Sequence, residues 1–267
     1  MTICVAATCC GGDGKAGTAV VVASDRMITM GGLTEFEHDV PKITQVGRRI
    51  VSLVAGDALR GSELVRLLGP VADASSVRAV AEQLAANYAQ LRRNIVNAWY
   101  FVPRSLTVEA FYEGGVQQKL LGPIAAQIDQ LVAAFDVGID VLLAGVDDQG
   151  AHIFMSRNPG GLVDDFEHVG FAAAGSGAIH GLQSLIGFEH SPARSLNETV
   201  FRVFASKRRA EVAPGVGKVT DLWIIDSEGV TKLGSEALKR LDGLYEEYER
   251  PTRADLEDKV QNLNLEE

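Results

Sequence analysis

The sequence has few of the features that would direct it to a membrane, to nucleic acid or to an oxidising compartment. No apolar run approaches the roughly 20 residues that span a bilayer, and no basic segment typical of a secretory signal follows Met1. Basic residues are outnumbered, 25 Lys and Arg against 35 Asp and Glu, and the formal net charge of −10 repels phosphate backbones and anionic lipid surfaces. We therefore expect no nucleic-acid partner, no membrane partner and a cytoplasmic location.

Cysteine is also scarce, and the histidines are not spaced as metal ligands. The three cysteines, Cys4, Cys9 and Cys10, are an odd number within a short segment, which favours reduced thiols over a disulfide framework. The five histidines lack the HExxH and paired-ligand spacings. Residues 11–15 (Gly-Gly-Asp-Gly-Lys) are similar to a phosphate-binding loop, but Ala16 stands where Ser or Thr is required and a strand follows. The sequence therefore predicts neither a metal site nor a cofactor.

The chain does contain enough apolar sequence for one substantial domain, because 46% of its 267 residues are hydrophobic. Short β-branched runs predict strands, and the turn residues between them predict hairpins. Apolar residues at a period of 3.6 predict amphipathic helices. The expected strands are 2–7, 18–24, 42–46, 49–55, 141–146, 152–156, 219–225 and 230–233, and the expected helices begin after Gly56 and include 77–95, 177–186 and 196–207.

The order of these elements predicts the fold class. Strands, paired helices, strands, paired helices and strands follow one another along the chain. This order favours a layered α/β fold in which two antiparallel sheets pack together and helices cover both outer faces. We therefore expect a four-layer αββα sandwich.

Two segments fall outside that order. Residues 100–138 are punctuated by proline and glycine, although 124–135 look helical, and we interpret them as an insertion. The tail carries a helical stripe that residues 256, 260 and 263 renew after Pro251; its first members are Leu238, Leu241, Leu244, Tyr245 and Tyr248. Such a stripe packs either on its own subunit or on another. The expected organisation is a domain over residues 1–234 with an insertion at about 100–138, followed by a helical extension over 235–267.

Thr2 is a candidate catalytic nucleophile, because removal of Met1 would leave a threonine with both a hydroxyl and a free α-amine. An α-amino group titrates near pH 7.7–8.0, so an appreciable fraction is unprotonated at neutral pH and can accept the hydroxyl proton. Nucleophile and base would then belong to one residue. Many proteins begin Met-Thr, so this position alone is a weak indication.

Further residues, in a fixed order, strengthen that interpretation. Residues 2–6 (Thr-Ile-Cys-Val-Ala) in a first strand, Asp25 with Thr29 and Gly31 after a second, Lys42 opening a third and Ala55-Gly56 ending a fourth resemble the proteasome β-subunit and its bacterial relatives. Residues 143–147 (Leu-Ala-Gly-Val-Asp) and 174–177 (Ala-Gly-Ser-Gly) are similar to the family's central strand and Gly-Ser-Gly turn. The resemblance runs from Thr2 to about Ile225 and implies the N-terminal-nucleophile (Ntn) hydrolase type of sandwich.

The resemblance also implies a role for each matched residue. Thr2 would be the nucleophile, Lys42 would disfavour a second positive charge on the neighbouring amine, and Asp25 would pair with Lys42. The backbone N–H of Gly56 would stabilise the oxyanion, and Ser176 would bind the amine and relay protons.

The implied activity is that of a threonine-type peptidase or amidohydrolase, which would cleave a polypeptide or peptide substrate through an acyl-enzyme. Thr29, Gly31 and Val54 would bind that substrate as an added strand. The resemblance further implies self-association into a ring or stacked homo-oligomer, with an ATP-dependent unfoldase as a candidate partner.

Simpler interpretations exist for each residue taken singly. Asp25 fits a strand end, Lys42 a solvated lysine, and residues 175–177 a plain turn. The chain also departs from the family: its first hairpin loop is longer, and residues 213–217 lack the Asp and Ser that many members carry, so Glu211 is the nearest acid. The alternative functions are a catalytically silent scaffold subunit and an Ntn transpeptidase or ligase.

Overall fold

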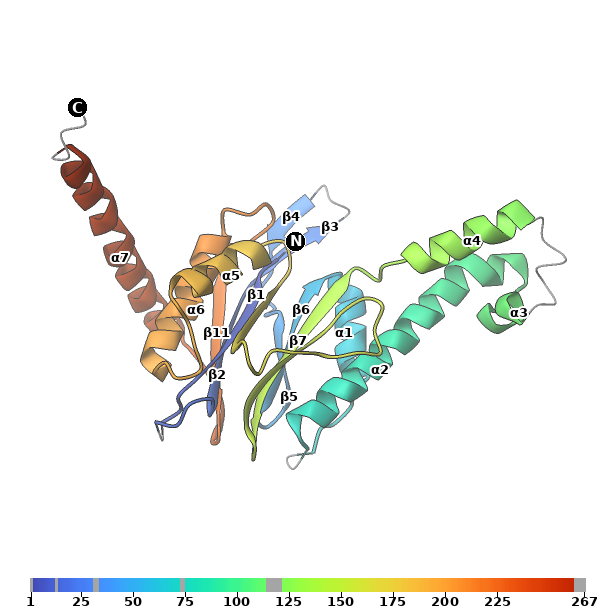
Figure 1. Ribbon diagram of the computed structural model, residues 1–267, viewed down its shortest axis with the longest axis horizontal. Helices are drawn as coiled ribbons and strands as arrows, with labels where there is room; N and C mark the ends of the chain where they lie inside the picture. The colour runs from blue at the N-terminus through green and yellow to red at the C-terminus, as the bar shows by residue number, and fades with distance from the viewer. Residues whose placement is uncertain (1, 13, 31–33, 73–74, 114–121, 262–267) are drawn as a thin grey trace.

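The chain folds into a mixed α/β architecture that contains two five-stranded antiparallel sheets (Figure 1). The computed structural model describes residues 2–12, 14–30, 34–72, 75–113 and 122–261, and of Thr29, Met30 and residues 249–261 it describes the backbone alone. Figure 1 shows the two sheets side by side in the body of the molecule, with helices on the outer side of each.

The first sheet has the strand order β10-β1-β2-β11-β12. Its strands are β1 (Cys4–Cys9), β2 (Ala19–Asp25), β10 (Phe171–Ala174), β11 (Thr220–Asp226) and β12 (Gly229–Lys232). Every residue of β1 and β2 is buried. Both strands are nearly continuous apolar runs because both of their faces are covered. Since Cys4 pairs with Ser24, the start of β1 lies beside the end of β2.

The second sheet has the strand order β5-β6-β7-β8-β9. Its strands are β5 (Ile43–Gly47), β6 (Ile50–Gly56), β7 (Ile139–Asp147), β8 (Gly150–Ser156) and β9 (Asp164–Asp165). Gly56 pairs with Ile139, so the end of β6 lies beside the start of β7. A separate two-stranded hairpin, β3 (Met27–Met30) and β4 (Thr34–Glu37), follows β2.

Alternate residues of the central strands face different cores. Val51 and Leu53 of β6 belong to a cluster that also holds Ala6 and Val22 of the first sheet, so the two sheets pack face to face. Ile50, on the opposite face of β6, belongs to a cluster shared with helices. Both faces of the strand are therefore buried, with the period of two that strand geometry imposes.

Pairs of helices cover the outer faces of the sheets. They are α1 (Ala58–Arg66), α2 (Val77–Val96), α5 (Ala178–Gly187) and α6 (Leu196–Ala210). The first pair shares a core cluster with β6 and β7, and the second pair shares one with β1 and β2. Side-chain oxygens of Asp57, Ser76 and Ser195 cap α1, α2 and α6, as expected for N-cap residues.

The predicted strands and helices are confirmed, with ends that differ by a few residues. The prediction missed β10, because its Phe-Ala-Ala-Ala sequence has little β propensity. That strand forms through pairing with β1, where Ala174 lies opposite Cys4. The β3–β4 hairpin was missed as well.

The segment interpreted as an insertion extends away from the sheets together with α2 (Figure 1). It contains η1 (Asn97–Phe101), η2 (Val102–Arg104), α3 (Val108–Tyr112) and α4 (Gly122–Ala134). The helix expected over 124–135 is therefore confirmed. Phe101, Phe111 and Ile128 are buried, and the Arg92 guanidinium of α2 donates to the Val132 carbonyl at 2.7 Å. The segment thus packs on α2.

The C-terminal helix α7 (Ser235–Gln261) follows the last strand. Three residues of the predicted stripe pack against the core beneath α6, namely Leu238, Leu241 and Tyr245. Leu244 and Tyr248 are about half exposed, at 53% and 52%. The side chains at 256, 260 and 263 lie outside the described residues. Packing on the same subunit therefore accounts for part of the stripe.

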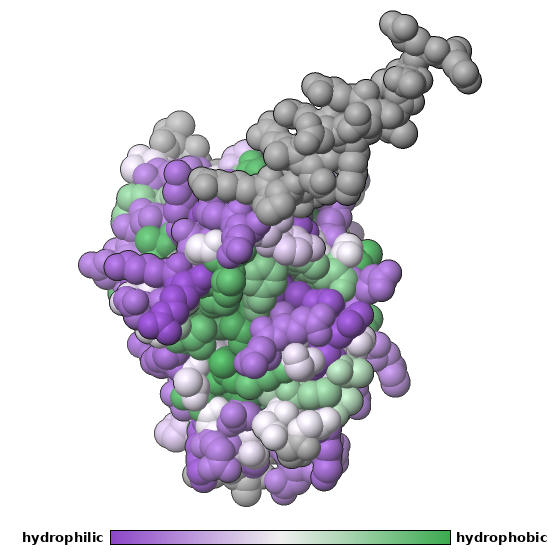
Figure 2. Space-filling model, turned by 90° about the vertical axis from the view of Figure 1, so that its left-hand side faces the viewer, coloured by the Kyte–Doolittle hydropathy of each residue, from purple (hydrophilic) through white to green (hydrophobic). Residues whose placement is uncertain are grey.

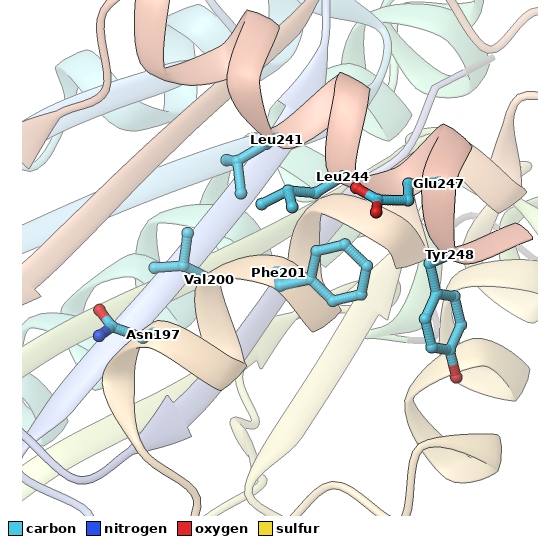
Figure 3. Close-up of a pocket in the computed structure, with 7 residues that line it drawn as sticks. All are labelled: Asn197, Val200, Phe201, Leu241, Leu244, Glu247 and Tyr248. Atoms are coloured by element: carbon cyan, nitrogen blue, oxygen red, sulfur yellow. The ribbon is translucent and has the colours of Figure 1, made fainter.

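A groove of about 830 Å³ lies between α6 and α7. Asn197, Val200, Phe201, Leu241, Leu244, Glu247 and Tyr248 line it (Figure 3). Figure 2 shows apolar surface gathered on this side of the molecule. The described residues that line the groove include no Lys, Arg or His beside a nucleophilic side chain.

Candidate active site

Thr2, Asp25 and Lys42 meet where three strands begin or end. Thr2 precedes β1, Asp25 is the last residue of β2, and Lys42 precedes β5. Antiparallel pairing brings the start of β1 to the end of β2, and Lys42 reaches the same point from the second sheet. The packing of the two sheets thus assembles residues that are separate in the sequence.

The Asp25 carboxylate is fully buried and receives hydrogen bonds on both oxygens. Oδ1 accepts from the Lys42 ammonium at 2.9 Å, from the Ile3 N–H at 3.0 Å and from the Thr2 hydroxyl. Oδ2 accepts from the Met27 N–H at 2.9 Å and from the Gly217 N–H at 3.0 Å. These donors satisfy the lone pairs of a carboxylate that stays ionised.

The surroundings of Asp25 set its charge state. Burial by itself would raise the pKa of Asp25, but the Lys42 ammonium and the hydrogen bonds from Thr2 and Gly217 outweigh burial and hold that pKa below its usual value. The carboxylate and the ammonium therefore form an ion pair in which Lys42 is 14% exposed and Asp25 is inaccessible to solvent.

The Thr2 hydroxyl lies between these two charges. It donates to Asp25 Oδ1 and accepts from the Lys42 ammonium, and the residue is only 1% exposed. A hydroxyl held between a cation and an anion has its lone pairs and its proton in defined directions. The arrangement orients Oγ1 for chemistry.

The main chain of Thr2 is held by the Gly-Ser-Gly turn that follows β10. The Thr2 N–H donates to Ser176 Oγ at 3.1 Å, and the Gly177 N–H donates to the Thr2 carbonyl at 3.1 Å. Ser176 Oγ in turn donates to the Pro214 carbonyl at 3.3 Å. Gly175 has a φ of +94°, and a Cβ there would lie 2.4 Å from the Thr2 carbonyl oxygen, so only glycine allows this close approach.

A cavity of about 270 Å³ opens beside Thr2. Its lining residues are Thr2, Ala55, Gly56, Asp136, Gly138, Ile139, Asp140, Gly175 and Ser176. Gly56, at the end of β6, has a φ of +100°, and a Cβ there would lie 2.1 Å from the Gly138 carbonyl oxygen. The glycines keep the cavity open at the point where Gly56 faces the same space as Thr2.

The charged groups in the cavity lining are both acidic. Burial raises the pKa of Asp140, the Arg157 guanidinium partly opposes that rise, and the Asp136 carboxylate adds to it. No Lys or Arg belongs to the lining in the part of the chain that the structure describes. The cavity is therefore suited to neutral or cationic groups.

The structure assembles some of the predicted site residues and not others. Thr2, Asp25, Lys42 and Ser176 are joined by hydrogen bonds, and Gly56 shares the cavity. Val54 is absent from the cavity lining, and its side chain packs against Gly61 of α1. Thr29 lies on β3 opposite Glu35, with only its backbone described, and Gly31 lies outside the described residues.

Sequence reasoning missed three contributors, namely Gly217, Asp136 and Asp140. Gly217 acts through its backbone N–H, for which no side-chain signal exists. Asp140 enters the site because β7 pairs with β6 and places Asp140 opposite Ala55, next to the predicted oxyanion glycine, and the sequence does not record that pairing.

The described residues contain no cluster of three or more His, Cys, Asp and Glu side chains that could hold a metal ion. Of the helices described, none is both long enough and apolar enough to cross a bilayer. No protein-family model matches the chain, and no curated protein matches its sequence.

Proposed function

We propose that this chain is a threonine-type Ntn hydrolase that cleaves peptide or amide bonds through an acyl-enzyme on Thr2. One observation carries the proposal: the Thr2 hydroxyl lies between the Lys42 ammonium and the Asp25 carboxylate, at the edge of a cavity that Gly56 shares. A threonine that only filled the core would need neither charge, since a buried ion pair contributes little to stability compared with apolar packing.

In the proposed reaction, Met1 is first removed and Thr2 Oγ1 then attacks the carbonyl carbon of the substrate. The hydroxyl proton passes to the α-amine, whose typical pKa of about 7.7–8.0 suits a base at neutral pH. The Gly56 N–H stabilises the oxyanion. The carbon–nitrogen bond breaks as the leaving amine takes up the proton. Water then hydrolyses the ester, which releases a carboxylic acid and restores the Thr2 hydroxyl.

Two neighbouring residues prepare Thr2 in this proposal. The positive charge of Lys42 disfavours protonation of the adjacent amine and so favours its basic form. Ser176 Oγ already accepts a hydrogen bond from the Thr2 nitrogen at 3.1 Å, and this contact would hold the free amine in place.

The arrangement of layers supports the same assignment. Two antiparallel sheets share one core cluster, and helix pairs share a cluster with the outer face of each sheet. This arrangement fits the proposed four-layer αββα sandwich of the Ntn type, in which the first strand presents its first residue to a cavity. The resemblance of residues 2–6, 25–31, 42 and 55–56 to the proteasome β-subunit points in the same direction.

Mapping of a covalent adduct tests the proposal. Intact-mass measurement should first show that Met1 is absent from reactive protein. Incubation with an electrophilic peptide should then add the mass of a single label, and digestion should locate it on Thr2. Thr2→Ala should abolish the labelling. Lys42→Ala should reduce it nearly as far, because without the Lys42 charge a larger fraction of the α-amine is protonated and cannot act as a base.

Thr8→Ala is the matched control, because Thr8 is buried on β1, the strand that Thr2 precedes, and its hydroxyl donates to the Gly170 carbonyl at 3.1 Å. This variant should label normally. Labelling of Thr2→Ala would reject the nucleophile. Retained Met1 with no labelling would favour a silent scaffold subunit, and transfer of the acyl group to an added amine rather than to water would favour a transpeptidase or ligase.

The acidic lining of the cavity predicts a substrate preference. Peptides with Lys or Arg next to the scissile bond should have a higher kcat/KM than peptides with Glu there, because the entering group meets Asp136 and Asp140. Asp140→Asn should reduce this preference. Equal rates for the matched basic and acidic peptides would contradict the assignment of this cavity to substrate.

The proposal includes self-association into a ring or stacked homo-oligomer, as the resemblance implies. The exposed groove between α6 and α7 supports a contact there, and Leu244 lines it while 53% exposed. Leu244→Glu should lower the particle mass measured by light scattering, whereas Leu162→Glu, at an 82% exposed position outside the groove, should not. A wild-type monomer at micromolar concentration would reject the assembly.

A further inference from the structure

Lys207 is a lysine with no solvent exposure, which is unusual because an ammonium loses its hydration when it is buried. It lies on α6, which packs on β1 and β2, the strands next to Thr2 and Asp25. The side chain does not act only as apolar filling, because its ammonium contacts polar groups. Core packing alone therefore does not explain why a lysine is buried at this position.

The ammonium of Lys207 is fully hydrogen-bonded. It donates to Glu211 Oε1 at 2.7 Å, to the Gly217 carbonyl at 2.9 Å and to the Lys218 carbonyl at 2.8 Å. These three acceptors use all three protons of the ammonium. Two of them belong to consecutive peptide groups of the loop between α6 and β11, so Lys207 holds the backbone of that loop.

The same loop supports the candidate active site. The Gly217 N–H donates to Asp25 Oδ2 at 3.0 Å, and this bond is among the interactions that hold the pKa of Asp25 below its usual value. Gly217 therefore links the two side chains: its carbonyl accepts from Lys207, and its N–H donates to Asp25. Gly217 packs closely against β3 and β4, since a Cβ there would lie 3.1 Å from the Met27 Cβ and 2.4 Å from Glu37 Oε1.

Positive and negative side chains alternate around this loop. Burial lowers the pKa of Lys207, and the Glu211 and Asp25 carboxylates oppose that effect. Glu211 also accepts from Arg208 at 2.8 Å. On the opposite side of Asp25 stands the Lys42 ammonium at 2.9 Å. Asp25 thus lies between two cationic side chains, one in direct contact and one acting through the loop.

Other titratable groups near Asp25 and the loop include Cys4, Glu37 and the ion pair of Arg26 with Asp221 at 2.7 Å. Burial raises the pKa of Cys4 to about 12, so its thiol stays neutral and adds no charge. Glu37 Oε1 accepts from the Val219 N–H at 2.8 Å and so holds the far end of the same loop.

We propose that Lys207 is a positioning residue that fixes the 217–218 backbone, so that the Gly217 N–H holds the Asp25 carboxylate in place and Asp25 holds Lys42 against Thr2. The proposal deepens the function proposed above and rests on it for the catalytic consequence. The effect on Asp25 itself does not depend on that function. The order of contacts is Lys207, Gly217, Asp25, Lys42 and Thr2.

Lys207→Met tests the proposal, because methionine has a similar length and no donor, and Glu211 keeps its partner Arg208. The pKa of Asp25, followed by carbon-13 NMR of its carboxyl group, should rise by on the order of one unit, which is tenfold in the ionisation constant. Labelling of Thr2 by an electrophilic peptide at neutral pH should slow about tenfold, because the Asp25 carboxylate is less firmly placed and holds the Lys42 ammonium less closely against Thr2.

Lys218→Met is the matched control. Lys218 is exposed, and its contact with Lys207 is made by the backbone carbonyl, which the substitution retains. This variant should leave the Asp25 pKa and the labelling rate unchanged. If Lys207→Met does not fold, Lys207→Gln, which keeps a donor, takes its place and should show a smaller shift in the same direction.

The outcomes separate this proposal from the proposed function. An unchanged Asp25 pKa in the folded Lys207 variant would overturn the positioning role, whatever the activity. A raised Asp25 pKa in a protein that no electrophile labels at Thr2 would support the positioning role and reject the hydrolase. A normal labelling rate together with a raised Asp25 pKa would show that Lys207 holds the loop but does not act on Thr2, and this too would overturn the proposal.

Discussion

Asp25→Asn is the substitution for which the structure predicts the largest loss of stability at the candidate site. The side chain is inaccessible to solvent and accepts five hydrogen bonds, three on Oδ1 and two on Oδ2. An asparagine of the same shape keeps one oxygen and turns the other position into an NH₂ group. In either orientation, that NH₂ group faces backbone N–H donors and leaves them without an acceptor.

The magnitude follows from the cost of breaking the buried ion pair. Removing one member of a buried ion pair costs about 3–5 kcal/mol, because the other charge stays buried and unpaired. Lys42 is 14% exposed, which places the cost toward the lower part of that range. Each kcal/mol lowers Tm by about 2–4 °C in a domain of this size. We therefore expect a cost of about 3–4 kcal/mol and a fall in Tm of roughly 6–16 °C.

Thermal unfolding followed by circular dichroism measures the effect, and its pH dependence identifies the cause. The folded pKa of Asp25 lies below its unfolded value of about 3.9, so the carboxylate stabilises the fold above that pH and the contribution is lost as pH falls through the folded pKa. The difference in Tm between wild type and Asp25→Asn should be largest near neutral pH and should narrow below about pH 4.

The control is Asp148→Asn, the same chemical change at a carboxylate that is 99% exposed and lies 3.7 Å from Arg49. It should change stability by less than about 0.5 kcal/mol. If Asp25→Asn melts within a degree or two of wild type at neutral pH, loss of the carboxylate does not leave Lys42 and the backbone donors without partners as the geometry indicates.

Two further predictions concern Thr2 and the thiols. Gly175→Ala should destabilise the fold by more than about 1 kcal/mol and abolish labelling of Thr2, because its Cβ would lie 2.4 Å from the Thr2 carbonyl oxygen at a φ of +94°. Gly187→Ala, with no atom within 4 Å of its Cβ, should do neither. Burial raises the pKa to about 12 for two thiols, those of Cys4 and Cys9. A disulfide reagent should therefore modify the half-buried Cys10 in the folded protein and the other two only after unfolding, and three equally fast thiols would contradict this assignment.

Local pattern accounts for much of the secondary structure. The β-branched run of β2 and the apolar stripe of α2 each identify their element without reference to the rest of the chain. The strand β10 is different, because its Phe-Ala-Ala-Ala sequence has no strand preference of its own and forms by pairing with β1. Pairing depends on which strand lies alongside, and no local period records that.

The residues of the candidate site likewise include some that the sequence can identify and some that it cannot. Thr2, Asp25, Lys42 and Ser176 could be picked out by their residue types and order, and the structure brings them together. Lys207 could not, because it begins a run of three basic residues at the end of α6, where basic side chains are favoured by the helix dipole. Its burial and its hydrogen bonds to the Gly217 and Lys218 carbonyls depend on the packing of α6 against the sheet and the loop.

By itself, the sequence determined which reactive groups the chain carries, the order in which they occur, and the continuous apolar runs that form strands buried on both faces. Only the tertiary structure decided which of these groups meet and in what charge state. Asp25 is held ionised by Lys42 and Gly217, which lie 17 and 192 positions away in the chain. Hydrogen bonds act over about 3 Å and require alignment. Strand register and helix packing set those distances, and both arise from contacts between segments that are remote in the sequence.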